Sequence, residues 1–587
     1  MGKKSFIFIV TIIMIFVFIA ATCLSCQAGL LPGSKISELE EDVEERGTAG
    51  DSDVKTDGAE EDGDKKKEEI IAATLWIDEI VPEDIAIEIK NRLETAFDEI
   101  KVVDDKESSD IRVEMELSGK NSEAEWVLVP VVSFFRICDD IYYDDFKKFW
   151  DGDIEALQYI SIDNTPPELI LTEEVYNVLE AVLGKSKNAD IKIVSEGELA
   201  ALIKDNNSFS IIPFDRLEKV YKALNVDNVS VFDKNIDTAG YPLCFRIGVE
   251  SDSADIKDEI SRCFEGVYLT NRETDKMASV IMTGVTALAR GKTIGRRMDE
   301  FGVLYPAEKI VDVLLDADIT HISNEICFVE GCSSENRFPY LCSCPHYIEL
   351  LEYIDTDVVE LTGNHMNDYG PEWMLKTLDM YDEREWPYFG GGRNLEESYR
   401  PALFEINENK IAFLGVNAYG LAANEWAGED SPGAARLNVW DETQKEEDFK
   451  KVEGIIKELK EQGYLVIFTF QYQEFERYSP TENQIADFGR VIDAGADIVS
   501  GSQSHWPMGV EFRGDGFINY GLGNLFYNMR DIPGLKQGII AKHIFYNGRH
   551  INTIMITTML EDLSQLRLTT PGERVELLNS VFDGSVR

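Results

Sequence analysis

Basic residues are scarce in this chain. Its 587 residues include 57 Lys and Arg against 109 Asp and Glu, which gives a formal net charge of −52. Nucleic-acid binding needs clustered Lys and Arg, so the charge balance argues against a nucleic-acid partner. A polyanionic partner would need a local basic pocket or a bridging cation.

The sequence also lacks two motifs that would identify a ligand, a phosphate-binding glycine loop in its first half and a zinc-binding pair of cysteines. No glycine loop that could cradle a phosphate occurs between residues 70 and 249, so the sequence names no ligand there. Cys327, Cys332, Cys342 and Cys344 crowd into one segment, but they lack the paired C-x2-C spacing of a zinc knuckle. Zinc is therefore disfavoured. One or two disulfides are expected instead in a chain outside the cytoplasm, with Cys332–Cys342 as the first choice.

The first residues have the pattern of an export signal. Lys3 and Lys4 precede an apolar run of about 16 residues, which is slightly short for a membrane span. The residues before Cys26 resemble a bacterial lipobox. We expect residues 1–26 to be a lipoprotein signal peptide with Cys26 as the lipid attachment site; an uncleaved anchor helix is the alternative. Either form holds the chain at the outer face of a bacterial cell membrane.

Residues 27–68 contain many acids and almost no large apolar residues. Such a segment cannot bury enough surface to offset its chain entropy, so a disordered acidic linker is expected. The remainder is globular in composition, with 44% apolar residues in the whole chain, and it is too long for one core.

Residues 69–270 alternate strand and helix patterns, which predicts an α/β domain with a mainly parallel sheet. The stretches WVLVPVVSF, LTEEVYNVLEAVLG, SIIPFDRL and YPLCFRIGV follow in the order shown by periplasmic solute-binding domains of the phosphate- and tungstate-binding type. The region resembles such a domain. The alternative is an α/β domain that binds no ligand. A polar hinge is expected over residues 251–276.

A second α/β unit is expected over residues 275–562, followed by a C-terminal tail over residues 563–587. Its organising stretch is Asp355–Gly370, where the apolar run of Val358, Val359 and Leu361 ends at a glycine. Ligand-type side chains follow at Asn364, His365, Asn367 and Asp368. This order is typical of a site at the carboxyl end of a buried strand.

The other strands of this unit also end in polar residues. The carboxyl ends of parallel strands lie at one edge of a sheet, so these residues are expected to converge in one cleft. The groups are Thr283–Gly284, Ser323–Glu325, Gly363–His365, Asn417, Gln471 with Glu474, Ser502–His505 and Asn524.

Four stretches in this unit resemble the CapA family of poly-γ-glutamate capsule synthesis proteins. They are LTGNHMNDYG, GGGRNLEES, IDAGADIVSGSQSHWP and INYGLGNLFYN. The resemblance implies a layered, metallophosphatase-like α/β domain after the smaller solute-binding-like one.

Residue by residue, the resemblance implies a set of roles. Asn364 and His365 fit a Gly-Asn-His motif, His505 fits the last His of Gly-His-His-Pro-His, and Glu474 fits the Glu of His-Trp-Gly-x-Glu. The implied catalytic residues are His365, His505 and Glu474, and the implied metal ligands are Glu325, Asn364 and His505. The candidate ligand-binding residues of this unit are Asn324, Arg393, Asn394, Gln471 and Asn524.

Departures from the family pattern weaken the implied metal site. Val285 stands where the family has an Asp, Phe470 falls by spacing where it has a His, and Ser502 and Gln503 replace two more His residues. A two-metal site needs several carboxylate or imidazole ligands. We therefore expect one divalent metal (Mn, Fe, Zn or Mg) or none.

Arg393 and Asn394 follow three glycines. Such a loop lets backbone N–H groups approach an anion, which an Arg fork can also bind; a loop with a solvated Arg is the alternative. The resemblance implies a role in synthesis, export or anchoring of an anionic polymer such as poly-γ-glutamate. Two modes stay open: a metal-dependent hydrolase or transferase, and a non-catalytic protein that binds a small ligand or a polymer end.

Overall fold

The computed structural model describes residues 72–115, 122–205, 207–420 and 425–587. The expected signal peptide, Cys26 and the acidic linker lie outside the described residues. No helix in the described part of the chain is both long enough and apolar enough to cross a membrane.

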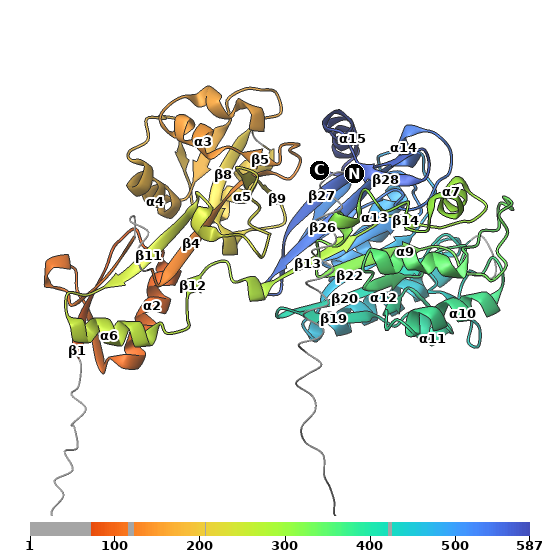
Figure 1. The fold of residues 1–587 in the computed structure, drawn as a ribbon, viewed down its shortest axis with the longest axis horizontal. Coiled ribbons are helices and arrows are strands. Elements are labelled where there is room, and N and C mark those ends of the chain that lie inside the picture. Colours follow the sequence, from red (N-terminus) through yellow and green to blue (C-terminus); the bar gives the residue numbers. More distant parts are fainter. Residues whose placement is uncertain (1–71, 116–121, 206, 421–424) are drawn as a thin grey trace, which may run out of the picture. The chain divides into compact units, whose positions relative to one another are not determined.

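The first domain contains one large sheet with short helices packed around it (Figure 1). Its strands are β1 (Ala72–Ile77), β2 (Glu99–Val102), β3 (Ile111–Met115), β4 (Ala124–Ser133), β5 (Asp140–Ile141), β6 (Glu168–Leu171), β7 (Lys192–Ile193), β8 (Ser208–Pro213), β9 (Tyr221–Ala223), β10 (Asn225–Val226), β11 (Cys244–Glu250) and β12 (Leu269–Thr270). Its helices are α2 (Glu83–Ala96), α3 (Tyr143–Trp150), α4 (Glu173–Leu183), α5 (Glu196–Asp205) and α6 (Ala254–Cys263).

The order of this sheet, β2-β1-β3-β11-β4-β8-β6-β7, contains the same arrangement twice. Strands β2, β1 and β3 are parallel and are followed by antiparallel β11; strands β7, β6 and β8 are parallel and are followed by antiparallel β4. Strand β4 also pairs with β11, so it joins the two halves. All ten residues of β4 are buried, which explains its almost unbroken apolar sequence.

The expected hinge at residues 251–276 is not a linker. It contains α6, and β12 pairs with β4 inside the sheet of the first domain. Ser253 caps α6 by accepting a hydrogen bond from the backbone N–H of Ile256. Polar composition suggested a hinge here because an exposed amphipathic helix is as polar as many linkers.

The second domain contains two large sheets and a two-stranded sheet formed by β18 and β21. Its strands are β13 (Met277–Met282), β14 (Val285–Thr286), β15 (Ile319–Asn324), β16 (Val358–Glu360), β17 (Tyr388–Phe389), β18 (Gly391–Gly392), β19 (Ala402–Ile406), β20 (Asn409–Asn417), β21 (Gly433–Ala434), β22 (Leu465–Gln471), β23 (Ile498–Ser502), β24 (Val510–Arg513), β25 (Gly516–Asn519), β26 (Gln537–Tyr546), β27 (Arg549–Glu561) and β28 (Gln565–Leu568). Its helices are α7 (Thr293–Phe301), α8 (Val311–Leu314), α9 (Ile348–Tyr353), α10 (Pro371–Asp382), α11 (Leu395–Ser398), α12 (Glu442–Glu461), α13 (Glu482–Asp493), α14 (Pro533–Lys536) and α15 (Pro571–Asp583).

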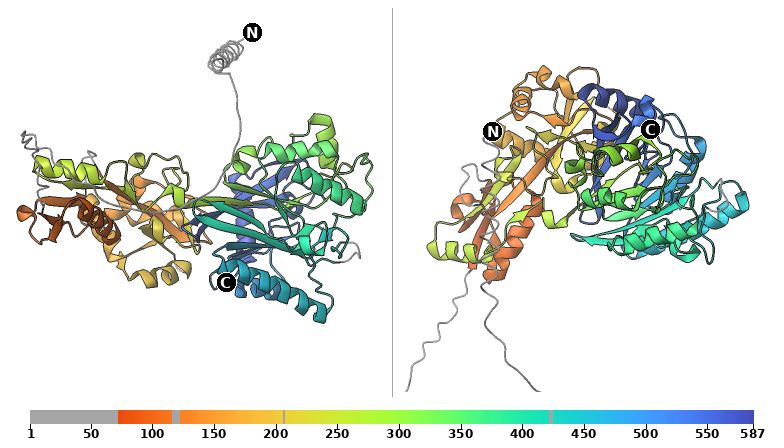
Figure 2. Two further views of the ribbon diagram at one scale, coloured as in Figure 1. Left: turned by 90° about the horizontal axis from the view of Figure 1, so that it is seen from below. Right: turned by 45° about the vertical axis from the view of Figure 1, so that its right-hand side comes forward.

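One sheet has the order β17-β16-β15-β13-β26-β27-β28, with β14 paired to β15, and the other has the order β19-β20-β22-β23-β25-β24. Alternate side chains of each sheet face different cores. Val280 and Ile467 lie in the core between the sheets, whereas Ile281 packs with α7 to α10 and Phe468 packs with α12 and α13. The domain therefore has four layers, with helices outside two stacked sheets (Figure 2).

Residues 563–587, expected to be a tail, belong to this fold. Strand β28 pairs with β27, and Leu577, Leu578, Val581 and Phe582 of α15 are buried in the core between the sheets. Thr570 and Glu573 form a capping box that starts α15. A packed helix was not predicted here from the sequence, because acidic and polar residues occupy the outer face of α15 and interrupt its apolar positions.

Candidate functional site

The polar ends of four strands meet at one edge of the second domain. Strands β15 and β16 are parallel in one sheet, and β20, β22 and β23 are parallel in the other. Glu325, Asn364, Gln471 and Gln503 follow or end these strands, and hydrogen bonds join all four side chains. The convergence expected from the sequence is therefore present for these residues.

The side-chain amide of Gln471 is the centre of this cluster. Its Nε2 donates to Glu325 Oε1 at 2.5 Å and to Asn364 Oδ1 at 3.0 Å, and it also donates to Gln503 Oε1. Its Oε1 accepts from the Ser502 hydroxyl at 2.6 Å. A neutral amide thus occupies the point where three oxygen atoms from both sheets meet.

Strand alternation determines that Gln471 and not Phe470 faces the site. Phe470 projects to the opposite face of β22, where its ring stacks on Phe488 with centroids 4.3 Å apart. The spacing of the sequence had placed Phe470 at a metal-ligand position of the family. The structure shows that its side chain points away from the site. On strand β22, the residue whose side chain enters the site is Gln471.

Close backbone packing brings Glu325 to the cluster. A Cβ atom on Gly363 would lie 2.7 Å from Glu325 Cγ, so any larger residue there would displace the carboxylate. Glu325 is 2% exposed, and this burial raises its pKa, although the nearby His505 and His365 act in the opposite direction. The site therefore holds a carboxyl group that resists ionisation.

His365 is oriented by Asp368 at the end of the same loop. Its Nδ1 lies 2.7 Å from Asp368 Oδ2, which also accepts from the backbone N–H of Leu341 at 2.7 Å. Burial disfavours the imidazolium form, but the Asp368 hydrogen bond and the Glu325 and Asp368 charges outweigh burial and raise the pKa of His365.

His505 is held on the other side of the cluster. Its Nδ1 lies 2.8 Å from Asn524 Oδ1, and Nε2 lies 3.9 Å from Glu474 Oε1. Gln503 Nε2 donates to the same Glu474 oxygen at 3.2 Å. Gln503 and His505 have positive φ angles of 72° and 54°, a backbone state that is uncommon outside glycine and that clusters at functional sites.

A buried extension of the network was not recognised from the sequence. Ser502 Oγ lies 3.3 Å from Glu360 Oε1, and Glu360 Oε2 lies 3.1 Å from His321 Nε2. Burial acts to raise the pKa of Glu360, but the hydrogen bond and charge of His321 outweigh it and lower that pKa. The sequence did contain one signal, a Glu at the end of the apolar strand β16. A charged residue that is fully buried is almost always paired, so a partner could have been expected.

Three residues expected at the site have other partners. Arg393 forms ion pairs with Asp379 and Asp382 at 2.8 and 2.6 Å, and Asn394 caps α11 by accepting from the backbone N–H of Glu397. Asn324 points away from the cluster, since it donates to the Ile326 carbonyl and the Tyr381 hydroxyl. Asn524 instead positions His505.

The donor set does not fit a two-metal centre. Val285 is packed among Ala287, Ile326 and Tyr527, and the oxygen atoms of Glu325 and Asn364 already accept hydrogen bonds from Gln471. Across the described ranges, no group of three or more His, Cys, Asp or Glu side chains could hold a metal ion. The cluster is instead suited to binding polar groups through amide, carboxyl and imidazole hydrogen bonds.

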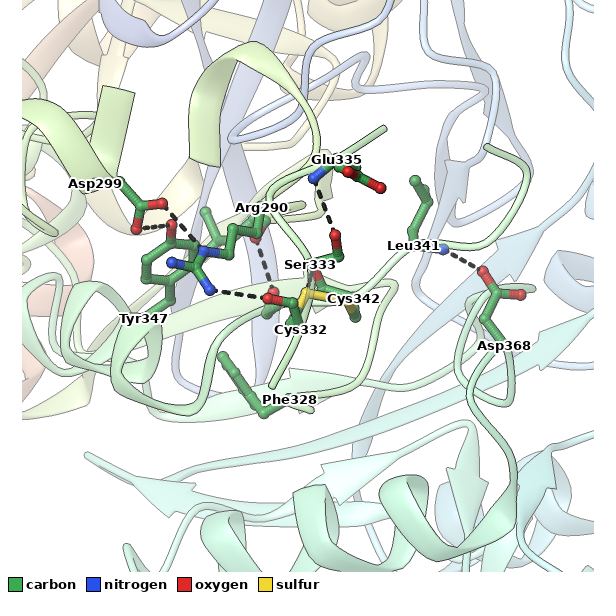
Figure 3. The surroundings of a disulfide bond; sticks show 12 residues. Arg290, Asp299, Phe328, Cys332, Ser333, Glu335, Leu341, Cys342, Tyr347 and Asp368 are labelled. Carbon is green, nitrogen blue, oxygen red and sulfur yellow. Dashed lines mark hydrogen bonds and ion pairs between the residues drawn. A yellow bond between two sulfur atoms is a disulfide. The ribbon is translucent and has the colours of Figure 1, made fainter. Parts of the chain in front are cut away.

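A loop beside the site is closed by a disulfide between Cys332 and Cys342, the pair preferred from the sequence. Arg290 donates to the Cys332 carbonyl at 2.8 Å, and its backbone N–H donates to the Cys342 carbonyl at 3.1 Å (Figure 3). Leu341 in the same loop donates to Asp368, the partner of His365. The covalently closed loop is thus tied directly to the site.

The stacked sheets and their strand-end cluster define a metallophosphatase-like α/β domain with altered ligand positions. Residues 279–529 match the family of bacterial capsule synthesis protein PGA_cap. This part of the chain is thus similar to that family of capsule synthesis proteins.

Two curated relatives are also similar to this chain. The capsule biosynthesis protein CapA of Bacillus anthracis is 22% identical over 288 residues, which are 48% of this chain and 67% of that protein. The PGA biosynthesis protein CapA of Bacillus subtilis (strain 168) is 22% identical over 233 residues, which are 39% of this chain and 57% of that protein. The chain thus spans between about half and two thirds of these relatives.

Among solved structures, an ABC-type phosphate transport receptor from Vibrio cholerae superposes on 33% of this chain and 93% of its own length, with a TM-score of 0.29 and 13% identity. The strand order of the first domain by itself shows its twofold arrangement.

Proposed function

We propose that this chain takes part in the synthesis, export or anchoring of an anionic extracellular polymer such as poly-γ-glutamate. The family match of residues 279–529 and the names of the two CapA relatives support this role. The apolar run and Cys26 near the start of the sequence support attachment to the outer face of a bacterial membrane.

The second domain acts in this proposal by binding and not by metal-dependent hydrolysis. The observation that carries this choice is the Gln471 amide, which donates to Glu325, Asn364 and Gln503. An N–H donor repels a cation, and the oxygen atoms that would ligate a metal are already engaged. Because the Gln471 N–H groups are engaged within the cluster, the imidazole Nε2 atoms of His365 and His505 beside it would bind the carboxylates of a polymer end.

A hydrolase or transferase is the second candidate, and the two imidazoles favour it. The Nδ1 atoms of His365 and His505 are held by Asp368 and Asn524. A His whose Nδ1 is fixed presents Nε2 in a defined direction, as a proton-transfer group requires. His365 and His505 would then exchange protons with the reacting group.

Two measurements on the purified chain separate these modes. For the binding mode, we expect less than one Mn, Fe, Zn or Mg ion per chain by elemental analysis. We also expect no phosphatase, phosphodiesterase or γ-glutamyl hydrolase activity with any of these metals added. Two tightly held metals per chain would contradict the binding mode. So would turnover that falls by about a hundredfold or more in His365→Ala or His505→Ala.

The role in polymer assembly and the membrane attachment have their own tests. Removal of the coding gene from the source bacterium should reduce its surface anionic polymer, and complementation should restore it. Cys26→Ala should release the chain from the membrane fraction or leave an unprocessed precursor. A mature N-terminus without lipid by mass spectrometry would contradict the lipoprotein proposal.

A further inference from the structure

A basic rim lies beside the strand-end site in this strongly acidic chain. We define the rim as residues 290–300 together with the disulfide-closed loop 332–342. These two segments carry five Lys and Arg (Arg290, Lys292, Arg296, Arg297 and Arg337) against three Asp and Glu, whereas the whole chain carries 57 against 109. A local excess of cations is the feature that a polyanionic partner requires.

Three of these cations are not neutralised by ion pairs. Arg290 pairs with Asp299 at 3.0 Å, and Arg297 pairs with Glu300 at 2.7 Å. Lys292, Arg296 and Arg337 form no ion pair with any described carboxylate. Their charges are therefore available to a partner, and the side chains of Arg296 and Arg337 are exposed.

The two segments of the rim are fixed to each other. The Arg290 contacts to the Cys332 and Cys342 carbonyls join them, and a Cβ atom on Gly291 would lie 2.5 Å from the Glu335 carbonyl oxygen. Figure 3 shows Arg290 beside the disulfide and Leu341 directed towards Asp368. The rim is thus a built surface and not two independent loops.

The rim leads to the site through aromatic contacts. Lys292 Nζ lies 5.0 Å from the ring centroid of Phe338 and 5.8 Å from that of Tyr527. The Tyr527 ring packs against His505 with centroids 5.3 Å apart. A chain bound along the rim would therefore reach His505 on one side and the loop of His365 on the other.

We propose that this basic rim docks an extended polymer chain that bears carboxylates and methylene groups, of the glutamyl type, and directs it to the strand-end site. The proposal rests on the polymer role proposed above. Lys292, Arg296 and Arg337 bind the carboxylates. Phe338 and Tyr340, which are 65% and 58% exposed, pack on the methylene groups. The apolar contacts favour a glutamyl chain over a polyphosphate, which has no methylene groups.

The test measures binding of fluorescently labelled poly-γ-glutamate to the purified full chain at low and high salt. The rim variant carries Lys292→Glu, Arg296→Glu and Arg337→Glu. The matched control carries Lys101→Glu, Lys185→Glu and Lys450→Glu, three exposed lysines elsewhere that form no ion pair with a described carboxylate. Both variants change the net charge equally, so they separate a local surface from bulk repulsion.

We expect the rim variant to weaken binding by about tenfold or more and the control by less than about twofold. A second variant, Phe338→Ser with Tyr340→Ser, should weaken binding of poly-γ-glutamate and leave any binding of polyphosphate unchanged. Thermal unfolding of each variant should match the parent chain, which shows that the fold is retained.

Several outcomes would overturn the docking proposal. Equal losses of binding in the rim and control variants, or no loss in the rim variant, would show that the rim does not dock the polymer. Neither result would contradict the proposed polymer role. Rim-dependent binding of polyphosphate with none of poly-γ-glutamate would show that the occupant is wrong. No binding of poly-γ-glutamate by the parent chain, at low salt, would count against the proposed polymer role as well.

Discussion

A side-chain amide connects the two sheets of the second domain where carboxylates and imidazoles would be needed for metal binding. The Gln471 NH2 group, which carries two hydrogens, lies within hydrogen-bond distance of three oxygen atoms, one of them on the buried Glu325. Buried polar networks are stable only when donors and acceptors match. The identity of residue 471 therefore determines both the chemistry and the stability of the site.

We expect Gln471→Glu to lower the free energy of unfolding by about 3 kcal/mol at neutral pH, because two buried carboxyl groups would then meet. Both groups would have folded-state pKa values above the ordinary Glu value of about 4.3. The variant should therefore approach the parent below that pH and lose stability as the pH rises through the folded-state values. Urea unfolding at several pH values measures this difference.

Gln537→Glu is the matched control, since Gln537 is also buried and its Oε1 accepts from the Tyr478 hydroxyl. A divalent cation should stabilise Gln471→Glu and leave the control unchanged. If Gln471→Glu is as stable as the parent at neutral pH, then Glu325 and residue 471 do not share the buried site described here.

Asp368→Asn should lower the pKa of His365, because the Asp368 hydrogen bond and charge are among the causes that raise it. A raised His pKa contributes stability that is fully present below the ordinary value of about 6.5 and is lost as the pH rises through the folded-state value. The variant should therefore lose more stability at acidic than at alkaline pH. NMR titration of the His365 ring measures the pKa directly.

Asn at position 368 keeps an oxygen acceptor for the Leu341 N–H, so the loop contact is retained in this variant. Asp379→Asn, which affects the ion pair with Arg393, is the control and should leave the His365 titration unchanged. An unchanged titration in Asp368→Asn would mean that Asp368 does not determine the charge of His365.

At the scale of elements, α15 shows how a helix at the end of the chain completes a core. Leu578 is 1% exposed and packs between the two sheets, whereas Val575 on the same helix is 43% exposed. We expect Leu578→Ala to cost about 3 kcal/mol of unfolding free energy and Val575→Ala to cost less than about 0.5 kcal/mol. Chemical denaturation of both variants checks this, and equal effects would show that α15 is not packed as described.

The sequence predicted the elements of the second domain better than their partners. Runs such as YLVIFTF and ADIVSGS indicated buried strands, and their polar ends indicated one shared edge. The direction of single side chains could not be read from spacing, because a one-residue shift moves a side chain to the other face of a strand. For that reason Gln471 was recognised as a ligand-type residue, but its central position was not.

Capping and ion pairs account for other errors of prediction. Asn394 and Arg393 follow three glycines, as anion-binding residues do, yet Asn is also a preferred helix N-cap and Arg also pairs with carboxylates on a neighbouring helix. The sequence does not show that Asp379 and Asp382 lie beside Arg393. Long-range pairing of this kind requires the fold.

At the scale of the whole molecule, the two domains are not independent. Residues 70–587 form one compact unit. Tyr546 of β26 packs edge-on against Phe214 with centroids 5.1 Å apart, and its hydroxyl donates to the Asn271 carbonyl at 3.1 Å. Met277, Ile544 and Ile551 belong to the same hydrophobic cluster as the core of the first domain.

These shared contacts predict one main unfolding transition in calorimetry, with agreement between the calorimetric and van't Hoff enthalpies. A fragment of residues 275–587 should melt below the full chain, because Tyr546 and Ile551 lose their partners. Two well-separated transitions in the full chain, each reproduced by a separate domain fragment, would contradict a shared core.

The disulfide between Cys332 and Cys342 bears on when the basic rim is assembled as well as on its structure. Disulfides form after a chain leaves the reducing cytoplasm. In the proposed role outside the cell, a newly made chain would still have an open loop there, and the disulfide would not yet restrict Phe338 beside Lys292. In the proposed role outside the cell, oxidation would therefore act as a maturation step, so that the surface that docks the polymer is assembled only where the polymer is handled.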